Sequence, residues 1–392
     1  MGQGVVPHSP SQLDVPDAYR QLETEQRNES LDPKSPSYLN PNSFLVWGPI
    51  TARPHLDTRF TYGNNLRSRT GSNENTLLEE ISPGSLFELG TKWKLDYTPT
   101  LSFYSSKDFK DTLGHNVLLA GGTTYDNWLF SLTQTYSVSS QPLIETGAQT
   151  DQENFVTSLG ASYYFNSKLM LQLGLDQNFR SAQAFTTSRS WSTMDWLNYQ
   201  VSSRLSIGAG LGGGYENVSP GSDMTFEQFQ TRVNMKIGRK LDLAINGGGE
   251  VRQILDVDSD PLINPIYGAS IQYRPFEQTT LSLSGNRQVS SSLLPGQVSE
   301  TTTISLALNQ RLLGLLYLTL SGGFSNNRYI LANNTLNLNR EDDNTNFAAS
   351  LSYSFITRGT VSVFYNYSDN SSSIAGFDYS SNQVGLQLGY RF

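Results

Sequence analysis

Apolar and polar residues alternate one by one along most of this chain, and this alternation restricts its fold more than any other feature. In the final stretch, SSNQVGLQLGYRF, one series is apolar and consists of Val384, Leu386, Leu388, Tyr390 and Phe392. The other series consists of Gln383, Gly385, Gln387, Gly389 and Arg391. A β-strand sends alternate side chains to opposite faces. The stretch therefore predicts a strand with one apolar and one polar face.

The same alternation recurs in about 18 segments of roughly 9–13 residues, a length that suits strands crossing a membrane at a tilt. The segments start near residues 54, 79, 95, 114, 127, 152, 168, 187, 204, 222, 240, 262, 278, 299, 315, 341, 359 and 378. In the segment near residue 187, RSWSTMDWLNYQ, either of the two alternate series of residues could form the outward face. Helical spacing is not sustained beyond residue 50.

The composition favours a membrane barrel over a soluble globule. Hydrophobic residues make up 37% and charged residues 16% of the 392 residues, and both shares are low for a soluble domain. Polar uncharged residues and glycine fill the difference, as expected where a lipid face alternates with a polar lumen. The chain has no Cys, which excludes disulfides and thiol–metal sites. Its net charge of −8 argues against a nucleic-acid partner.

The connectors between the segments alternate between short and long. Short ones include YDN, FNSK and IGRK, and long polar ones include RSRTGSNENTLLEE, SQPLIETGAQTDQ and SSSLLPGQVSE. Outer-membrane barrels have short periplasmic turns and longer external loops. We therefore predict an all-β, antiparallel, up-and-down transmembrane β-barrel over residues 51–392, in the cell outer membrane with both termini periplasmic. Residues 1–50, rich in Pro and Ser, are predicted to form a largely irregular periplasmic extension.

The C-terminus fits this fold. If the last strand closes against the first, Tyr390 and Phe392 lie in the periplasmic aromatic girdle. The terminal Phe after alternating apolar residues also resembles the C-terminal insertion signal of outer-membrane barrels. That resemblance implies that Tyr390 and Phe392 form a membrane-assembly signal for the barrel-assembly machinery.

The first hairpin, FTYGNNLRSRTGSNENTLLEEISPG, resembles that of a β-barrel porin family of Gram-negative outer membranes. ISPG (Ile81 to Gly84) matches the family pattern well, whereas YGNN has Gly63 where the family usually has Asp. Genes of this family often accompany exopolysaccharide export. The resemblance therefore implies a conduit with polysaccharide and periplasmic export components as partners.

The inward-facing residues are mostly Ser, Thr, Asn, Gln and Gly, which suits neutral hydrophilic solutes such as sugars. The pore-lining candidates are Asp57, Arg59, Asp176, Arg232, Lys236, Asp242, Glu250, Arg252, Gln172 and Asn234, and Arg180 and Arg391 share the inward parity. The opposed charges of Arg232 and Lys236 and of Asp242 and Glu250 form either a transverse field or a simple neutralisation between neighbouring strands. Inward aromatics such as Phe226 and Tyr317 either stack on sugar rings or fill the wall.

No constellation for catalysis or cofactor binding is present. The three histidines, His8, His55 and His115, lie far apart in strand order and outside any motif with Ser or Asp partners. The acidic stretches DVDSDP and NREDDN are read as solvated loops rather than calcium sites. We expect no enzyme activity, no cofactor and no fixed metal.

Three functions remain open. The first is a channel for hydrophilic solute that acts as an exopolysaccharide export conduit, the second a general diffusion porin for small sugars or ions, and the third a structural or surface barrel without an open pore. Outer-membrane lipid and lipopolysaccharide are expected contacts in each case. Residues 1–50, or a loop such as 327–341, are candidates for filling the lumen.

Overall fold

The computed structural model describes residues 45–64, 75–143, 148–183, 185–255, 260–294, 296–331, 340–356 and 358–391. A two-residue strand, β1 (Val46–Trp47), is followed by eighteen strands of 12–17 residues. They are β2 (Ile50–Asn64), β3 (Asn75–Leu89), β4 (Trp93–Tyr104), β5 (Thr112–Tyr125), β6 (Trp128–Leu143), β7 (Ala148–Tyr164), β8 (Leu169–Ala182), β9 (Thr187–Ser202), β10 (Leu205–Ser219), β11 (Met224–Ile237), β12 (Leu241–Ile254), β13 (Leu262–Phe276), β14 (Thr279–Ser291), β15 (Gln297–Leu312), β16 (Leu316–Leu331), β17 (Arg340–Ile356), β18 (Gly359–Ser372) and β19 (Tyr379–Arg391).

Each of the strands β2–β19 pairs antiparallel with its neighbours in the chain, and β19 pairs with β2 to close the sheet. At this seam Leu386 lies opposite Phe60, and Tyr390 lies opposite Leu56. Closure removes the free edges that an open sheet would expose. The predicted eighteen-stranded, up-and-down antiparallel barrel is confirmed, and every strand begins within four residues of the predicted start.

The connections differ between the two ends of the barrel. At one end, here called the short-turn end, they have two to four residues, and at the other, the long-loop end, they have four to ten. The predicted strand length of 9–13 residues was too short. SQPLIETGAQTDQ and SSSLLPGQVSE, read as loops, are partly strand, since β6 runs to Leu143 and β14 runs to Ser291. Polar residues continue the hydrogen-bonded ladder there, so hydrophobicity does not mark the strand ends.

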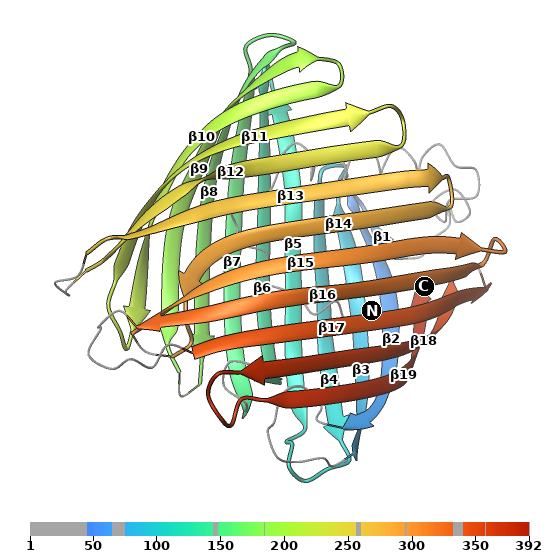
Figure 1. Ribbon diagram of the computed structural model, residues 1–392. Coiled ribbons are helices and arrows are strands. Elements are labelled where there is room, and N and C mark those ends of the chain that lie inside the picture. The colour runs from blue at the N-terminus through green and yellow to red at the C-terminus, as the bar shows by residue number, and fades with distance from the viewer. Residues whose placement is uncertain are drawn as a thin grey trace.

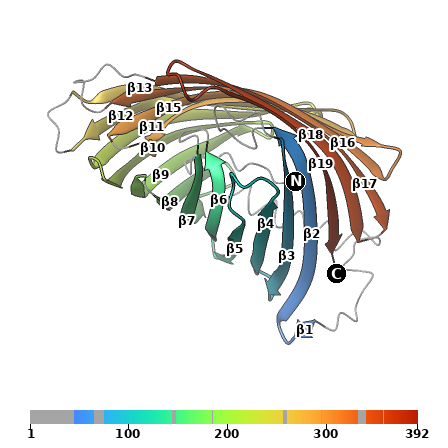
Figure 2. The ribbon, with the colours of Figure 1, turned by 90° about the horizontal axis from the view of Figure 1, so that it is seen from below.

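The barrel has two walls whose strands run in different directions. Figure 1 shows β13–β19 crossing in front of β3–β8, and the view from below in Figure 2 shows these walls meeting where β19 lies beside β2. Residues 1–44, most of the predicted periplasmic extension, lie outside the described residues. Within the described part of the chain, no helix is long and apolar enough to cross a membrane.

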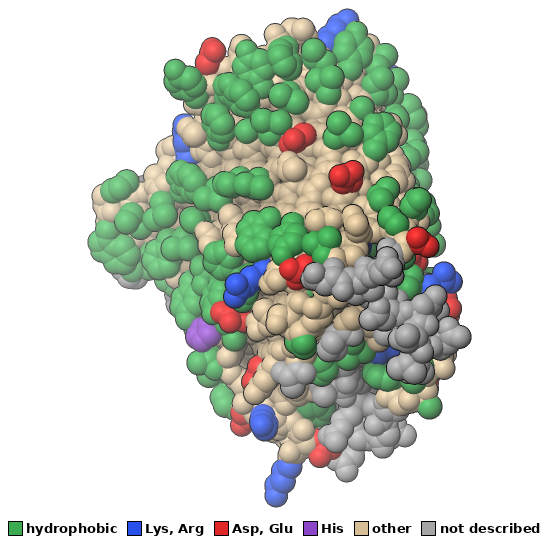
Figure 3. All heavy atoms as spheres, turned by 90° about the vertical axis from the view of Figure 1, so that its left-hand side faces the viewer, with side chains coloured by type: hydrophobic (Ala, Val, Ile, Leu, Met, Phe, Trp, Pro, Cys, Tyr) green, Lys and Arg blue, Asp and Glu red, His purple; other side chains and the backbone are tan. Residues whose placement is uncertain are grey.

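Apolar side chains cover the outer face of the barrel. Leu173, Val233, Leu351 and Leu386 are all exposed there, while Gln172, the neighbour of Leu173, is buried on the inner face. Figure 3 shows hydrophobic side chains spread over one side of the barrel with few charged ones between them. Exposed apolar surface on this scale is expected of a membrane-embedded protein.

Strand β9, whose parity was ambiguous in the sequence, has apolar residues on both faces. Trp191 and Leu197 are exposed on the outer face, whereas Met194 and Trp196 are buried on the inner face. The inner pair lies over β10, where a row of glycines, Gly208, Gly210, Gly212 and Gly214, leaves space for large neighbours. An added Cβ at Gly210 would stand 2.7 Å from both Met194 and Trp196. The glycine row therefore explains why aromatic and apolar side chains face inward on β9.

Candidate functional site in the barrel lumen

Aromatic side chains on the outer face form two belts. Outward aromatic pairs spaced eight residues apart occur on four strands, namely Trp128 with Tyr136, Phe155 with Tyr163, Trp191 with Tyr199, and Phe347 with Phe355. Eight residues extend about 26 Å along a strand, which a tilt of roughly 40° reduces to about 20 Å along the membrane normal. That height is close to the apolar band of an outer-membrane barrel. The belts thus place the membrane around the middle of the strands.

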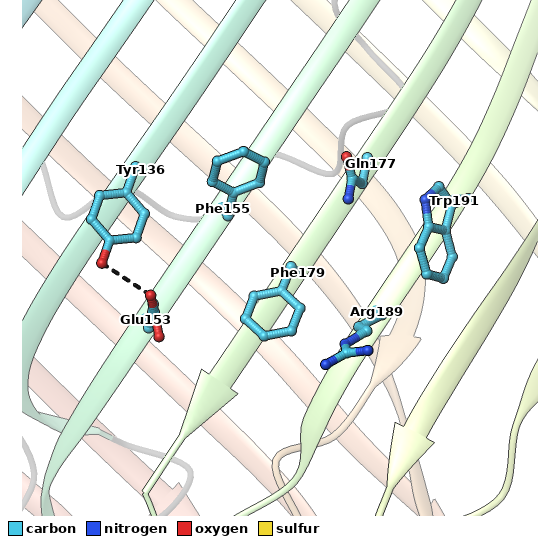
Figure 4. A pocket seen from close by; sticks show the side chains of 7 residues that line it. All are labelled: Tyr136, Glu153, Phe155, Gln177, Phe179, Arg189 and Trp191. Carbon is cyan, nitrogen blue, oxygen red and sulfur yellow. Dashed lines mark hydrogen bonds between the residues drawn. The ribbon is translucent and has the colours of Figure 1, made fainter.

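A shallow cavity of about 400 Å³ lies in the belt nearer the long loops, on the outer face of β6–β9. Figure 4 shows its lining, which consists of Tyr136, Glu153, Phe155, Gln177, Phe179, Arg189 and Trp191. The Tyr136 hydroxyl donates to Glu153 at 2.9 Å, and the guanidinium of Arg189 lies 5.1 Å from the ring of Phe179. Since these residues alternate with inward Ser158 and Asp176, the cavity faces lipid rather than the lumen.

Side chains on the inner face of β8–β11 form hydrogen bonds and a cation–π contact with one another. Arg232 donates through Nε to Asn198 at 2.9 Å and through a terminal nitrogen to Gln172, and its guanidinium lies 4.2 Å from the ring of Trp196. Asn198 also donates to Gln172 at 2.8 Å. The Arg232 charge therefore meets amide oxygens and an aromatic face. Asn234, the next inward residue on β11, lies opposite Ser206 and Ala244.

Further inward candidates lie on β2 and β8. Arg59 stacks on Phe364 with 4.2 Å between guanidinium and ring centre, and Phe364 in turn covers Gly385 at the closing seam. Asp57 lies beside Gly389 on the same inner face. On β8, Asp176 is buried and accepts a hydrogen bond from the Ser158 hydroxyl at 2.6 Å.

The inner face near the short turns contains solvent-exposed charges. Lys236 lies directly opposite Asp242 on the neighbouring strand, and Asp242 pairs with Arg274 of β13 at 3.0 Å. Tyr317, another inward residue of this region, is 41% exposed and lies 5.6 Å from the guanidinium of Arg311. Charges of opposite sign on neighbouring strands neutralise each other here. Water reaches these side chains.

Several charged side chains on the inner face near the long loops are buried. Arg252 bonds to Glu250 at 2.8 Å and to Glu216 at 3.4 Å, and all three side chains are at least nine-tenths buried. A second buried pair, Arg340 with Asp342, lies at the same end on β17. Glu250 and Arg252 were among the sequence candidates. Glu216 was not, although the alternation along β10 places it among the inward-facing residues.

Asp223 holds the connection between β10 and β11, at the long-loop end, through hydrogen bonds. Its carboxylate accepts hydrogen bonds from the hydroxyl of Tyr215, from the side-chain amide of Asn217 at 2.8 Å and from the backbone N–H of Val218 at 3.1 Å. These bonds, that of Tyr215 above all, hold the pKa of Asp223 below its usual value. The ionised carboxylate thus stabilises the end of this hairpin.

His55 is brought close to two residues that sequence spacing did not connect to it. Its Nε2 lies 3.1 Å from the hydroxyl of Thr98, which donates its proton to Asp96 at 2.8 Å. A hydroxyl that gives its proton to a carboxylate is not activated by the imidazole, so this contact does not form a nucleophile–base pair. His115 instead bonds to Tyr97 at 3.0 Å on the outer face. Among the described residues, no group of three or more His, Cys, Asp or Glu side chains is arranged to hold a metal ion.

Comparison with known proteins points to porins. Residues 225–392 match the model of the family described as "Putative beta-barrel porin 2". No curated protein matches the chain. The structure resembles those of OpdO from Pseudomonas aeruginosa (15% identity, 87% of this chain and 97% of that chain, TM-score 0.47), OccK2 (OpdF) from the same organism (13%, 87% and 98%, 0.46) and OccAB4 from Acinetobacter baumannii (11%, 90% and 100%, 0.46).

Because these identities lie below 25% and the TM-scores below 0.5, the solved structures support no conclusion about solute or mechanism. The family match adds to what the closed sheet, the apolar outer face and the aromatic belts already indicate. The expected resemblance to a β-barrel porin family is confirmed by the match over residues 225–392, which lies outside the first hairpin: this chain resembles the β-barrel porins and folds as a porin-like barrel.

Proposed function

We propose that this protein is a water-filled channel that passes neutral hydrophilic solutes, in particular saccharides, across the outer membrane. The observation that carries the proposal is the exposed polar lining near the short turns. Arg274 and Asp242 face inward and are 48% and 37% exposed, although they lie within a closed barrel. Polar groups that remain wet inside a membrane protein line a path for water and for solutes that replace water.

The lining favours neutral solutes because its charges are balanced locally. Asp242 is bonded to Arg274, and Arg232 is surrounded by amide oxygens and Trp196, so no ring of one sign is formed by these residues. Hydroxyls such as Ser284 and Ser305, which share a 2.7 Å hydrogen bond, can exchange that bond for one to a sugar hydroxyl. Exposed Tyr317 offers a ring face on which a sugar can stack.

Swelling of protein-containing liposomes tests the proposal. Neutral sugars should enter at rates that fall with size, and a singly charged sugar acid or amino sugar of equal size should enter at a rate within about threefold of the neutral one, since locally paired charges select weakly between ions. Liposomes without protein are the control. Absence of swelling with the full chain, and also after removal of residues 1–50, would contradict an open channel.

The direction of transport is part of the proposal. We favour export of a polysaccharide, with both termini in the periplasm where export components would contact the barrel, because of the resemblance in the first hairpin. Uptake of small sugars by diffusion is the alternative. Entry of linear oligosaccharides well beyond the trisaccharide supports the conduit, whereas a cutoff at di- or trisaccharides supports the diffusion porin.

We also propose that Tyr390 and Phe392 direct assembly of the barrel. Phe392 lies outside the described residues, while Tyr390 closes the seam opposite Leu56. Replacing Phe392 with Asp would put a charge where the girdle requires an aromatic ring. The heat-modifiable folded species should then decrease strongly in outer membranes, with Phe392→Tyr as the matched control. Equal amounts in both variants would contradict the assignment.

A further inference from the structure

One strand of the barrel leaves the wall before it ends. Strand β14 pairs with β13 only as far as Arg287, which lies opposite Tyr267, whereas β13 continues to pair with β12 as far as Leu262. The remaining residues of β14 and the start of its loop, residues 288–294, are here called the β14 arm. Figure 1 shows the end of β14 curving away from β13.

The β14 arm packs against the inner face of the barrel. Val289 belongs to a buried apolar cluster with Val218 of β10, Met224 of β11 and Ile254 of β12, and with Val298 of β15. The exposed side chains of Tyr215, Phe229 and Val251 face outward on β10–β12. The cluster residues of these strands occupy the alternate positions and therefore lie on the inner face. The arm therefore lies inside the wall that β10–β12 form, within the lumen.

Polar contacts hold the base of the β14 arm, residues 288–291, to β10 and β12. Arg252 donates to the backbone oxygen of Val289 at 3.2 Å, and the Ser291 hydroxyl donates to Glu216. Arg252 and Glu216 are in turn part of the buried ion network with Glu250. The base of the arm is thus anchored by apolar packing and by charges that cannot separate without exposing an unpaired ion.

Ser291 and the tip of the β14 arm, residues 292–294, reach elements further around the barrel. Arg180 of β8 donates to the backbone oxygen and the hydroxyl of Ser291 at 3.1 and 3.3 Å. In the connection between β8 and β9, Thr186 donates through its backbone N–H to the Leu293 oxygen at 3.0 Å and through its hydroxyl to the Ser292 oxygen at 2.9 Å. Five strands separate β8 from β14 in the sheet, so the arm extends over the inner face of the intervening wall to reach these partners.

We propose that the β14 arm is the constriction that sets the size limit of the channel, and that its bonds to Arg180 and Thr186 form a latch that keeps it narrow. This inference rests on the proposed channel function. Residues 327–341 were a candidate for filling the lumen. Among the described residues, the segment that enters the lumen is the β14 arm. Leu293 at the tip is 4% exposed, but the contacts that reach β8 and the β8–β9 connection are hydrogen bonds. The base has apolar and ionic anchors, so the tip is the part that can be released.

A reversible disulfide tests the latch in a chain that has no Cys of its own. The hydrogen bond between the backbones of residues 186 and 293 puts their Cα atoms at a separation of about 5–6 Å, which a disulfide can span. Thr186→Cys with Leu293→Cys should cross-link on oxidation. Because Thr186→Cys also removes one hydrogen bond of the latch, reduction should leave the tip weakly held.

The matched control is Tyr367→Cys with Asn382→Cys, which joins register partners on the outer face of the adjacent strands β18 and β19. In planar bilayers, reducing the 186–293 disulfide should raise the single-channel conductance at least about twofold and enlarge the sugar cutoff, as conduction depends on the narrowest part of the pore. The control should not respond to reductant. Arg180→Gln should shift conductance in the same direction as reduction.

Equal conductance of the oxidised and reduced 186–293 variant, in a channel that conducts, would overturn the constriction and leave the channel function intact. Silence of every variant, the control included, would overturn the proposed function and the constriction together. Failure of the 186–293 pair to cross-link while the control pair does so would show that the tip of the arm is not held at this site, and would also overturn the proposal.

Discussion

The two ends of the lumen contain the same kind of ion pair in opposite surroundings. Near the short turns Arg274 pairs with Asp242 at 3.0 Å, and the side chains are 48% and 37% exposed. Near the long loops Arg252 pairs with Glu250 at 2.8 Å, and the side chains are 3% and 1% exposed. The first pair leaves room for water, whereas the second is covered by the β14 arm. Burial, not the presence of charge, separates the solvent-exposed part of the lumen from the part that the arm narrows.

The largest effect should follow from breaking the buried pair. Arg252→Met keeps much of the side-chain volume but leaves the carboxylates of Glu216 and Glu250 without their cation. The loss should lower the free energy of unfolding by about 3–5 kcal/mol, the usual cost of an unpaired buried charge. Denaturant titration of the protein in lipid vesicles measures it. Adding Glu250→Gln should recover part of the loss, and no recovery would contradict the role given to the pair.

A charge placed on the lipid face should have the next largest effect. Leu306 is exposed on the outer face in the middle of β15, and Ser305 beside it faces the lumen. Arg at position 306 should reduce the free energy of unfolding by about 2–4 kcal/mol, as at the midplane of other barrels. Ser305→Arg, the matched control on the wet side, should cost much less. Equal costs in the same titration would contradict the assignment of the two faces.

The smallest effect should come from the exposed pair. Arg274→Met removes the partner of Asp242, but solvent screens both charges. We expect a change in unfolding free energy of less than about 1 kcal/mol, as for exposed ion pairs generally. A cost equal to that of Arg252→Met would show that the two ends of the lumen do not differ as described.

The strand order and starts were predictable because alternation with a period of two is a local signal. Closure of the last strand on the first was expected as part of the barrel, and β19 pairs with β2. The ends of β6 and β14 were missed because the ladder continues through polar residues beyond the apolar band. The β14 arm was missed for a related reason. Val289 and Val298 belong to the outward-facing series of their strands. Alternation alone does not show whether such an apolar face contacts lipid or packs against an inner wall.

The contacts of the lumenal charges were only partly visible in the sequence. Alternation identifies the inward residues of a strand, but the register between strands decides which of them meet. Arg232 was weighed against the carboxylates of β12, but its contacts include Asn198, Gln172 and Trp196, two of them on β9. The contact between Arg180 and Ser291 depends on the departure of β14 from the wall, for which no local pattern exists.

The central claim is that the lumen is solvent-exposed near the short turns and narrowed by the buried β14 arm near the long loops. Single-Cys variants test it directly, with the thiol at Asn309, which is exposed on the inner face, or at Ser292, which is 1% exposed in the arm. In proteoliposomes, a water-soluble maleimide should modify the thiol at position 309 at least about 100 times faster than the thiol at 292, because a buried thiol reacts only when its surroundings open. Similar rates at the two positions would contradict the account.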